Sequence, residues 1–492
     1  MGGEAADGGG EHLVSELAYL SATEALQRFR DRSLSPVELT QALIDRAAEV
    51  EPTVNALCVT RYEEALAEAR AAEDRYMGKG DPPRPLEGIC VGIKDEVPIA
   101  GHPCSGGSLL EKDEIATVTD PMAERILAAG GIPHARTTTP EFSCAGFTHT
   151  RLWGVTRNPW NPEFAVGGSS GGTGASLASG TSTLATGSDI GGSIRIPAGW
   201  NGVVGFKPPY GRVPLLPPFN MDHFCHNGPL ARTVADCALF ENVIAGPHPV
   251  DAAAIAPKYE LPASFEAIEG LRLALCVRPG DWPVDDDVEA AVRDAAGTLA
   301  DCGAVVEEVE LPTFRPEHVM AVSSTHLALI MGQSMELAME HRDLLCAYTV
   351  ALMEEALEGK TVQDLYAGIV DETALHAELE AVHAGYDAVL CPVNAARGLI
   401  AGDDYVGHAP TIGGVTVPEY FWACLTIPFN ICSRNPVLVA PAGFATNGVP
   451  VGIQIVGRRY DDLTPFRVGA ALEQARPWLD VPERRPMQVA VT

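Results

Sequence analysis

Short apolar runs that alternate with helical segments restrict the fold of this chain more than any other feature of its sequence. LRLALCV (271–277) precedes the helical segment VDDDVEAAVRDAAGTLADCGA (284–304), which is followed by the apolar run VVEEVELP (305–312). Such alternation is typical of α/β folds, in which helices cover a central sheet. The 492 residues contain no internal repeat and no linker with a break in composition. We therefore predict a single large α/β domain rather than two domains.

Two helices are expected in the N-terminal part of the chain. Ser35, Pro36 and Glu38 have the order of an N-cap, an N1 proline and a capping-box glutamate, which predicts a helix that begins there and runs to about residue 50. RYEEALAEARAAEDR (61–75) is dominated by alanine and glutamate and contains no helix breaker, so we predict a second helix there.

The remaining segments are assigned from their apolar content and their turn residues. IPHART (132–137) is interpreted as a short apolar turn, and the glycine-rich segment 393–420 as a functional loop or lid. Residues 1–12 are predicted to form a disordered tail. Further buried strands are expected within 85–99 and at DAVLCPV (387–393), PVLVAPA (436–442) and GVPVGIQIVG (448–457).

The charge of the chain excludes some classes of partner. Its net charge is −31 and its isoelectric point is about 4.7, whereas binding to nucleic acid or to an anionic membrane requires basic surface. The N-terminus lacks the basic and apolar regions of a signal peptide, and no run of 18 apolar residues occurs. We predict a cytoplasmic protein without a nucleic-acid or membrane partner.

The cysteines and histidines do not predict a metal site. The twelve cysteines include no CxxC pair, so we interpret most of them as buried thiols. His223 and His226 are three residues apart, but no further ligands at a recognisable spacing accompany them. We therefore expect neither a disulfide framework nor a bound metal.

Two segments rich in glycine and serine are candidates for the chemistry. In GSDIGGSIRIP (187–197), Gly191 and Gly192 leave consecutive backbone amides free to converge on one oxyanion, and Ser193 lies at the edge of that nest. An ordinary glycine-rich turn explains this segment equally well. In GGSSGGTGAS (167–176), Ser169 has the spacing of a nucleophile elbow, but the preceding residues contain two prolines and do not predict the strand that an elbow requires.

Lys94 follows the apolar run LEGICVGI, and this position allows two interpretations. The side chain is either the polar end of a strand or a desolvated amine whose lowered pKa suits it to act as a base. The residues themselves do not decide between the two.

Taken together, the motifs resemble the amidase signature family, whose members are serine hydrolases with a Ser-Ser-Lys triad. The resemblance covers nearly the whole chain and implies one domain over 13–492, with a mixed central sheet flanked by helices, a signature core at about 86–240 and a variable substrate region at about 315–425. The matching motifs are GIKD (92–95), RTTTPEF (136–142), WGVTRNPWN (153–161), GGSSGG (167–172), GSDIGGSIRIPA (187–198), GVVGFKPPYGRVP (202–214), GPLARTVAD (228–236) and PVGIQIVGRRYDD (450–462).

The resemblance implies a role for individual residues. Ser193 would be the nucleophile, Ser169 a serine after a cis peptide bond that relays the proton, and Lys94 the base. The backbone amides of the oxyanion hole would be those of Ile190, Gly191, Gly192 and Ser193. The side chains that hold the two glycine loops together would be those of Ser170, Asp189 and Arg195. The residues that line the substrate pocket would be Phe142, Ser143, Cys144 and Gly168.

The activity implied by the resemblance is hydrolysis of an amide C–N bond through a seryl acyl-enzyme, with no metal or organic cofactor. Aryl amides, anilides and carbamates (urethanes) are the expected small-molecule substrates, and the protein is expected to be a monomer or homodimer. An amidotransferase subunit that acts only in a complex is an alternative, although Ile196 stands where such subunits usually have glutamine. A binding-only member and a conventional Ser-His-Asp hydrolase, in which Ser169 would be acylated, are further alternatives.

Overall fold

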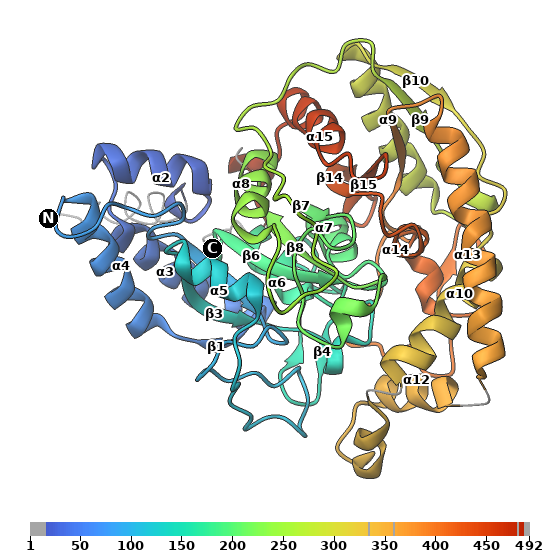
Figure 1. Cartoon of the computed structure of the whole chain (residues 1–492), viewed down its shortest axis with the longest axis horizontal. Helices are drawn as coiled ribbons and strands as arrows, with labels where there is room; N and C mark the ends of the chain where they lie inside the picture. The colour runs from blue at the N-terminus through green and yellow to red at the C-terminus, as the bar shows by residue number, and fades with distance from the viewer. Residues whose placement is uncertain (1–15, 333–334, 358–359, 480–481, 487–492) are drawn as a thin grey trace, which may run out of the picture.

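A central sheet of eleven strands organises the computed structural model, which describes residues 16–332, 335–357, 360–479 and 482–486 (Figure 1). The predicted disordered tail, 1–12, lies outside the described residues. In spatial order the strands are β1 (Leu57–Thr60), β3 (Ile132–Thr137), β2 (Cys90–Lys94), β6 (Leu184–Asp189), β8 (His226–Ala231), β7 (Val204–Lys207), β14 (Val437–Phe444), β15 (Pro450–Gly457), β11 (Ala388–Pro392), β9 (Arg272–Leu275) and β10 (Val305–Glu308).

The sheet is mixed, as the resemblance implies. β2 pairs in parallel with both β3 and β6, and β9 pairs in parallel with both β10 and β11. The remaining neighbours in the sheet pair antiparallel. The single-domain α/β prediction is therefore confirmed, with parallel strands near both ends of the sheet and antiparallel strands in its middle.

Helices cover the sheet and extend beyond its two ends. Helices from the N-terminal part of the chain lie beside β1 and β3, whereas α9, α10, α12 and α13 lie at the opposite end of the molecule (Figure 1). The longer helices are α2 (Ala22–Asp31), α3 (Pro36–Val54), α4 (Tyr62–Tyr76), α5 (Pro121–Ala128), α6 (Gly171–Ala178), α7 (Arg195–Asn201), α8 (Val234–Ile244), α9 (Asp286–Asp301), α10 (Pro316–Leu327), α12 (Ala347–Leu357), α13 (Val362–His383) and α15 (Leu463–Ala475), and a single turn forms α14 (Pro428–Ile431).

The predicted start of α3 is confirmed by its hydrogen bonds. The Ser35 hydroxyl accepts from the backbone amide of Val37 at 3.0 Å, and the Glu38 carboxylate accepts from the amide of Ser35 at 2.8 Å. These two bonds satisfy amides that the first turn of a helix leaves without a partner. The helix also runs four residues further than predicted, to Val54.

The interpretation of IPHART (132–137) as a turn is wrong, because these residues form strand β3. All six are buried, with β1 on one side and β2 on the other. A short strand covered on both faces has no alternation of polar and apolar residues, and periodicity therefore cannot distinguish it from other apolar segments.

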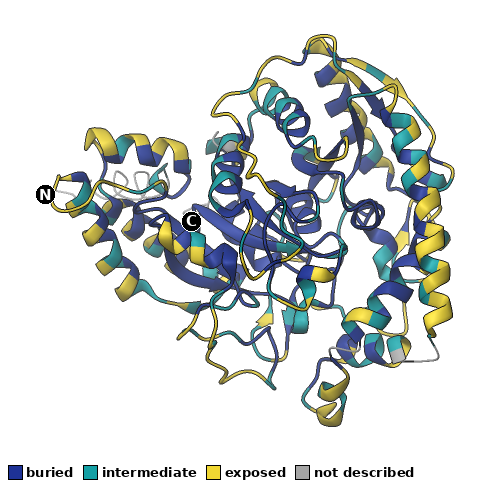
Figure 2. Ribbon diagram, viewed as in Figure 1, coloured by how far each residue is buried: buried dark blue, intermediate teal, exposed yellow. Residues whose placement is uncertain are grey.

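Two short helices, α6 and α7, lie inside the molecule and are completely buried, and α6 consists mostly of small residues (Figure 2). A Cβ atom at Gly174 of α6 would lie 2.8 Å from the side-chain amide nitrogen of Asn201 in α7. The glycines therefore let the two helices approach each other closely. Both helices belong to the glycine- and serine-rich motifs, which the fold places at its centre.

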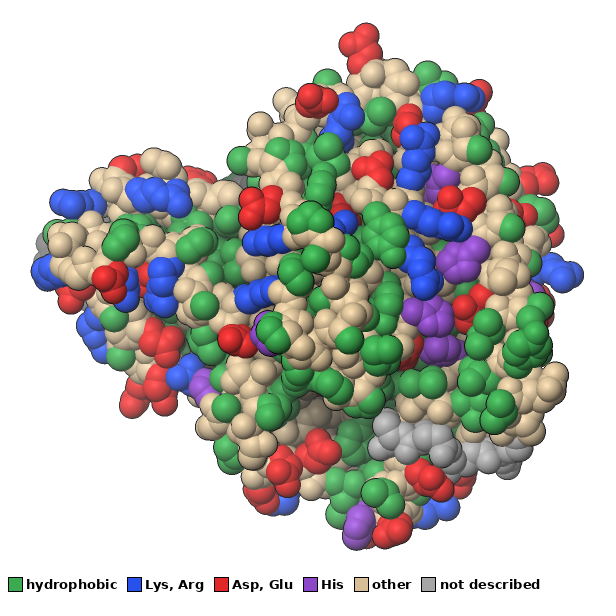
Figure 3. Space-filling model, viewed as in Figure 1, with side chains coloured by type: hydrophobic (Ala, Val, Ile, Leu, Met, Phe, Trp, Pro, Cys, Tyr) green, Lys and Arg blue, Asp and Glu red, His purple; other side chains and the backbone are tan. Residues whose placement is uncertain are grey.

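The segment 393–420, which the sequence predicts to be irregular, contains little regular structure. It forms one two-stranded hairpin, β12 (Thr411–Ile412) with β13 (Val415–Thr416), and leads into a short 3₁₀ helix at Tyr420–Ala423. Among the described residues, no helix combines the length and apolar content needed to cross a membrane. Lysine and arginine side chains are interspersed with acidic and neutral ones on the face drawn in Figure 3.

Candidate active site

Lys94 is the last residue of β2, and its side chain is completely buried. Its amine, Nζ, lies 2.7 Å from Ser169 Oγ and 2.8 Å from Ser188 Oγ. The loss of water around it lowers the pKa of Lys94, although the carboxylates of Glu96 and Asp189 oppose this effect. Of the two interpretations of this lysine, the structure therefore favours the desolvated amine over a solvated strand end.

Ser169 lies in the loop that leads into α6, and the peptide bond between Gly168 and Ser169 is cis. The backbone carbonyls of Ala145 and Phe147 enclose Gly168 so tightly that a Cβ atom there would lie 2.5 Å from each carbonyl oxygen. Only glycine fits in this space. Ser169 is 1% exposed, and its hydroxyl lies 2.7 Å from Lys94 Nζ.

The loop between β6 and α7 contains Ser193 and is organised by the carboxylate of Asp189. Asp189 Oδ1 accepts from the amide of Gly192 at 2.8 Å, and Oδ2 accepts from the amide of Ile194 at 3.2 Å. Gly192 has a φ of 125°, and a Cβ atom there would lie 1.9 Å from Thr426 Oγ1. The loop therefore requires glycine at this position, both for its backbone conformation and for its space.

A buried ion pair fixes this loop to the sheet. Arg195 donates to both oxygens of Asp189 at 2.9 Å, and both side chains are completely buried. Burial alone would raise the pKa of Asp189, but the Arg195 guanidinium holds it well below its usual range. Arg195 also donates to Thr426 O and to Gln454 Oε1. The predicted supporting pair thus connects the loop to two other segments of the chain.

The predicted oxyanion amides are not all equivalent. The amide of Gly192 is bonded to Asp189, whereas within the described part of the chain the amides of Ile190, Gly191 and Ser193 have no acceptor. Ser193 is 6% exposed, and its hydroxyl forms no hydrogen bond with the described residues. Three amides and one hydroxyl in this loop are therefore available to a ligand.

The two glycine-rich loops are joined next to these groups. The amide of Ser170 donates to Ser193 O at 3.2 Å, and the Ser170 hydroxyl lies 3.4 Å from both the amide nitrogen and the carbonyl oxygen of Ser188. The structure thus brings the predicted residues Lys94, Ser169 and Ser170 next to the Ser193 loop. Ser169 and Ser193 do not share a side-chain hydrogen bond in this state, and such bonds often tighten only when substrate binds.

The predicted substrate residues 142–144 form a tight turn that is connected to Lys94 through Glu96. Phe142 and Ser143 have φ values of 51° and 57°, which side-chain-bearing residues rarely adopt. The Ser143 hydroxyl donates to the carboxylate of Glu96, which also contacts Lys94. The Cys144 sulfur instead lies 3.7 Å from Thr349 Oγ1 in α12. Ser143 is therefore connected to the lysine, whereas Cys144 is connected to the variable region.

Residues of the predicted variable region, 315–425, contact the segment that contains this turn. Tyr348 of α12 accepts from the amide of Glu141 and donates to His149 O, both at 2.8 Å. The ring of Phe147 lies edge-on to Tyr348 at 5.2 Å and 5.1 Å from the ring of Tyr420. Phe147 is also the residue whose carbonyl encloses Gly168. An aromatic cluster thus joins the variable region to the loop of Ser169.

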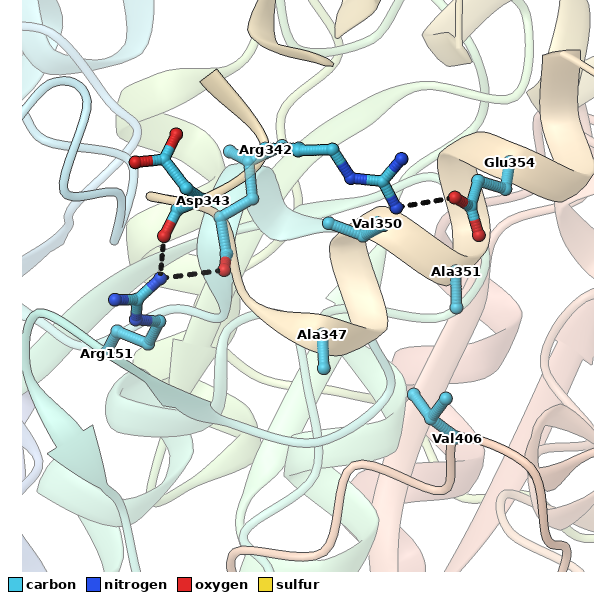
Figure 4. Close-up of a pocket in the computed structure, with 9 residues that line it drawn as sticks. Arg151, Arg342, Asp343, Ala347, Val350, Ala351, Glu354 and Val406 are labelled. Atoms are coloured by element: carbon cyan, nitrogen blue, oxygen red, sulfur yellow. Dashed lines mark hydrogen bonds and ion pairs between the residues drawn. The ribbon is translucent and has the colours of Figure 1, made fainter. Parts of the chain in front are cut away.

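A cavity of about 500 Å³ lies on another face of α12 (Figure 4). Its lining from α12 consists of Ala347, Val350, Ala351 and Glu354. Arg151 also lines the cavity and donates to Asp343 O and Leu345 O. None of the predicted catalytic residues borders this cavity. Helix α12 therefore has one set of residues toward the 141–149 segment and another toward the cavity.

A second buried lysine, Lys207, lies at the end of β7 on the other side of Asp189. Its amine is 3.2 Å from Pro208 O, 3.3 Å from Ser433 O and 3.4 Å from His226 Nε2. Burial lowers the pKa of Lys207 to about 7, and the charge of Arg195 adds to this effect. His226 is bonded to backbone carbonyls, and no group of three potential metal ligands occurs among the described residues.

Sequence reasoning missed Glu96, Ser188, Thr426 and Asn430. The signal for Glu96 was its position two residues after Lys94, and Ser188 was already inside the motif GSDIGGSIRIP. Thr426 donates to Gly191 O at 2.7 Å, and Asn430 donates to Asp189 Oδ1 at 2.7 Å. These two residues are far from that loop in the sequence, and no local pattern indicates such a contact.

Comparisons with known proteins agree with this architecture. The amidase family model matches residues 38–464. The chain is 34% identical to an acylamidase of Rhodococcus erythropolis over 94% of this chain and 97% of that protein. It is also 34% identical to a glutamyl-tRNA(Gln) amidotransferase subunit of Roseiflexus sp. (strain RS-1) over 95% of this chain and 98% of that protein. The solved structure of a bacterial aryl acylamidase is similar with a TM-score of 0.88 and 29% identity, over 95% of this chain and 99% of that one.

Proposed function

Because this chain belongs to the amidase family, we propose that it hydrolyses the C–N bond of a small amide through an acyl-enzyme on Ser193. The observation that carries the proposal is the contact between a fully buried lysine and a serine hydroxyl, Lys94 Nζ to Ser169 Oγ at 2.7 Å. This contact lies beside a loop in which, among the described residues, Ser193 Oγ and three backbone amides have no partner.

Acylation begins with attack of Ser193 Oγ on the carbonyl carbon of the amide. The hydroxyl proton of Ser193 passes to Ser169 Oγ, while the proton of Ser169 passes to the neutral amine of Lys94. The carbonyl oxygen becomes an oxyanion and accepts from the free amides of the loop. Return of the proton through Ser169 to the nitrogen of the substrate lets the C–N bond break, and the amine leaves.

Deacylation follows the same route with water in place of Ser193. The water oxygen attacks the ester carbonyl, and its proton is taken through Ser169 by Lys94. Collapse of the second oxyanion breaks the bond to Ser193 Oγ, which recovers a proton from the relay. The products are a carboxylic acid and the amine, and the relay needs only the side chains of this chain.

The test is the site of covalent labelling. The protein is treated with a fluorophosphonate, and the labelled residue is identified by intact mass and peptide mapping, with Ser193→Ala and Ser169→Ala in parallel. We expect the label on Ser193 and none in Ser193→Ala. A label on Ser169 that persists in Ser193→Ala would contradict the proposal and would favour a conventional hydrolase mechanism.

The finer proposal concerns the substrate. We propose aryl amides, anilides or carbamates, because the aromatic rings of Phe147, Tyr348 and Tyr420 pack together, because Tyr348 and Tyr420 contact the segment 141–146, and because a bacterial aryl acylamidase is structurally similar. A carbamate presents the same carbonyl to the oxyanion amides. We expect p-nitroacetanilide and methyl N-phenylcarbamate to be hydrolysed with a higher kcat/KM than butyramide. The reverse order would contradict this proposal.

The similarity to a glutamyl-tRNA(Gln) amidotransferase component supports a second candidate, an amidotransferase subunit that acts only within a complex. The two candidates differ in what the isolated chain does. Turnover of amides by the purified protein at ordinary enzymatic rates would favour the hydrolase, whereas activity that appears only with partner proteins would favour the amidotransferase.

In keeping with the acidic charge, we propose a cytoplasmic monomer or homodimer that acts on a small molecule.

A further inference from the structure

Glu96 lies where the buried lysine, strand β6 and the predicted substrate turn meet. It follows β2 in a turn closed by the amide of Val97, which donates to Lys94 O at 3.0 Å. The turn folds the Glu96 side chain back over the lysine, so that Oε1 lies 3.0 Å from Lys94 Nζ. The carboxylate side chain is 26% exposed, whereas the lysine beside it is fully buried.

Two hydroxyl groups also bond to this carboxylate. Ser188 Oγ donates to Glu96 Oε1, and Ser143 Oγ donates to Glu96 Oε2. Lys94 Nζ thus has three oxygen neighbours, which belong to Ser169, Ser188 and Glu96. Among the three, only the carboxylate is unable to donate a hydrogen bond while it is ionised.

This difference fixes the orientation of the amine. A neutral lysine amine has two N–H bonds and one lone pair. One N–H must point to Glu96, because the carboxylate only accepts. The Ser188 hydroxyl has its proton on Glu96, so its oxygen accepts the second N–H. The lone pair of Lys94 is left facing Ser169, which is where a base must receive the proton.

We propose that Glu96 is a positioning residue for the proposed reaction, whose carboxylate orients the amine of Lys94 toward Ser169 and sets the pH above which that amine accepts a proton. The proposal rests on the proposed function, since it requires that Lys94 is the base. The heavy atoms fit both protonation states of the lysine. In the ammonium form the third N–H donates to Ser169 Oγ, and no atom other than the proton needs to move.

The second part of the proposal follows from charge. Burial lowers the pKa of Lys94, and the Glu96 carboxylate beside it acts in the opposite direction by stabilising the ammonium form. Removal of this one negative charge, with the oxygen acceptor retained, therefore releases the lysine proton at lower pH. Glu96→Gln makes that change, because its carboxamide oxygen can still accept from Lys94 and from Ser188.

Other groups face the same two side chains and must be separated from this effect. The titratable or charged side chains that face Lys94 or Glu96 from neighbouring elements include Cys104, Asp120, Asp189 and Cys225, and Arg136 of β3, whose guanidinium donates to Lys94 O at 3.5 Å. Burial raises the pKa of both thiols, and Arg195 keeps Asp189 ionised, so these three groups keep their charge near neutral pH. Burial raises the pKa of Asp120 to about 7, and Asp120 therefore needs its own control.

The experiment measures the second-order rate of fluorophosphonate labelling of Ser193 between pH 5 and 10, which requires no knowledge of the substrate. We expect the midpoint of the rise with pH to fall by about 1 to 3 pH units in Glu96→Gln, with a plateau rate within about tenfold of the wild type. Glu96→Ala is expected to show the same shift and a plateau that is about 10- to 100-fold lower, because the charged hydrogen-bond partner is lost.

Two matched variants serve as controls. Glu87→Gln removes a buried carboxylate that pairs with Arg84 far from this site, and Asp120→Asn removes the neighbouring acid while it keeps the cap of α5. Both are expected to leave the midpoint unchanged. An unchanged midpoint in both Glu96 variants, or a midpoint that moves only in Asp120→Asn, would overturn the proposal.

Failure of this proposal differs from failure of the proposed function. If the wild type is not labelled on Ser193, or if Lys94→Ala is labelled as fast as the wild type, the proposed function itself is wrong. If labelling of Ser193 depends on Lys94 while the Glu96 variants keep the wild-type midpoint, only the role of Glu96 is wrong.

Discussion

Two lysines, Lys94 and Lys207, are completely buried at the ends of strands of one sheet, and Asp189 influences both of them. Lys94 ends β2 and contacts two hydroxyl groups and a carboxylate. Lys207 ends β7 and contacts two backbone carbonyls and an imidazole nitrogen. Burial lowers the pKa of both amines. The two lysines therefore differ in the hydrogen-bond partners of their amines and not in how deeply they are buried.

The difference shows what a base requires beyond a lowered pKa. The hydroxyl of Ser169 can donate a proton to Lys94, and it lies beside the loop of Ser193. A backbone carbonyl has no proton to give, and His226 has its other nitrogen, Nδ1, next to the carbonyls of Asp189 and Phe224. Nε2 of His226 lies 3.4 Å from Lys207 Nζ and 3.3 Å from Ser433 O, and none of the three neighbours of the Lys207 amine is a hydroxyl group. Lys207 is suited to hold backbone segments together, whereas Lys94 is suited to exchange a proton.

The largest expected effect tests this difference directly. Lys94→Ala should lower the rate of amide hydrolysis about 10²- to 10⁴-fold, which is the usual contribution of a general base. Lys207→Met should keep the rate within about tenfold of the wild type. Turnover of p-nitroacetanilide by the three proteins, with folding checked by circular dichroism, measures both. Equal losses in the two folded variants would remove the distinction between the lysines.

A large effect on stability is expected from loss of the buried ion pair between Asp189 and Arg195. Arg195→Met leaves the buried carboxylate of Asp189 without its partner, and loss of one member of a buried pair costs about 3–5 kcal/mol in the free energy of unfolding. Urea unfolding of the wild type, Arg195→Met and Arg195→Lys measures this cost. Arg195→Lys keeps a positive charge and should lose less. A change below about 1 kcal/mol in Arg195→Met would mean that Asp189 is stabilised by other groups.

A moderate effect is expected on the pH dependence of stability. The pKa of Lys207 falls from its ordinary value of 10.5 to about 7 on folding. Between these values the unfolded chain binds a proton that the folded protein does not, so the free energy of unfolding rises with pH, by up to about 1.4 kcal/mol per pH unit. Lys207→Met should lack this contribution.

Thermal or urea unfolding of both proteins at pH 7.5 and 8.5 provides the measurement, because groups that Lys207 does not influence contribute equally in the two proteins. The stability of the wild type relative to Lys207→Met should increase with pH in this window. A constant difference would show that Lys207 keeps an ordinary pKa in the folded protein.

The smallest expected effect concerns Ser188, whose hydroxyl accepts a hydrogen bond from Lys94 but has no part in the proposed proton relay. Ser188→Ala removes the hydrogen bond that Ser188 accepts from Lys94 and the one that it donates to Glu96, and it should lower kcat about 3- to 10-fold with little change in KM. Ser176→Ala is the matched control, because Ser176 is a buried serine whose hydroxyl donates to a backbone carbonyl of its own helix. A KM effect in Ser188→Ala larger than its kcat effect would place Ser188 in substrate binding.

Much of the candidate site could be predicted because its residues lie in short, distinctive motifs. The glycines of GSDIGGSIRIP indicate a loop with free amides, and a side chain at Gly192 would indeed collide with Thr426. The structure keeps that loop but uses the amide of Gly192 for Asp189, which reduces the predicted set of four amides to three. The sequence could not indicate this, because it does not say which amides a neighbouring carboxylate takes.

By itself, the sequence determined the alternation of strands and helices, the capped start of α3 and the positions of the glycine and serine motifs, because each depends on residues close together in the chain. The tertiary structure alone decided that IPHART is a buried strand, that α12 and Tyr420 support the segment 141–149, and that Glu96 contacts Lys94. The sequence allowed two interpretations of Lys94, and only its surroundings favour one of them. Burial and hydrogen-bond partners come from segments far apart in sequence, and it is these that set the protonation of a lysine and the orientation of its lone pair.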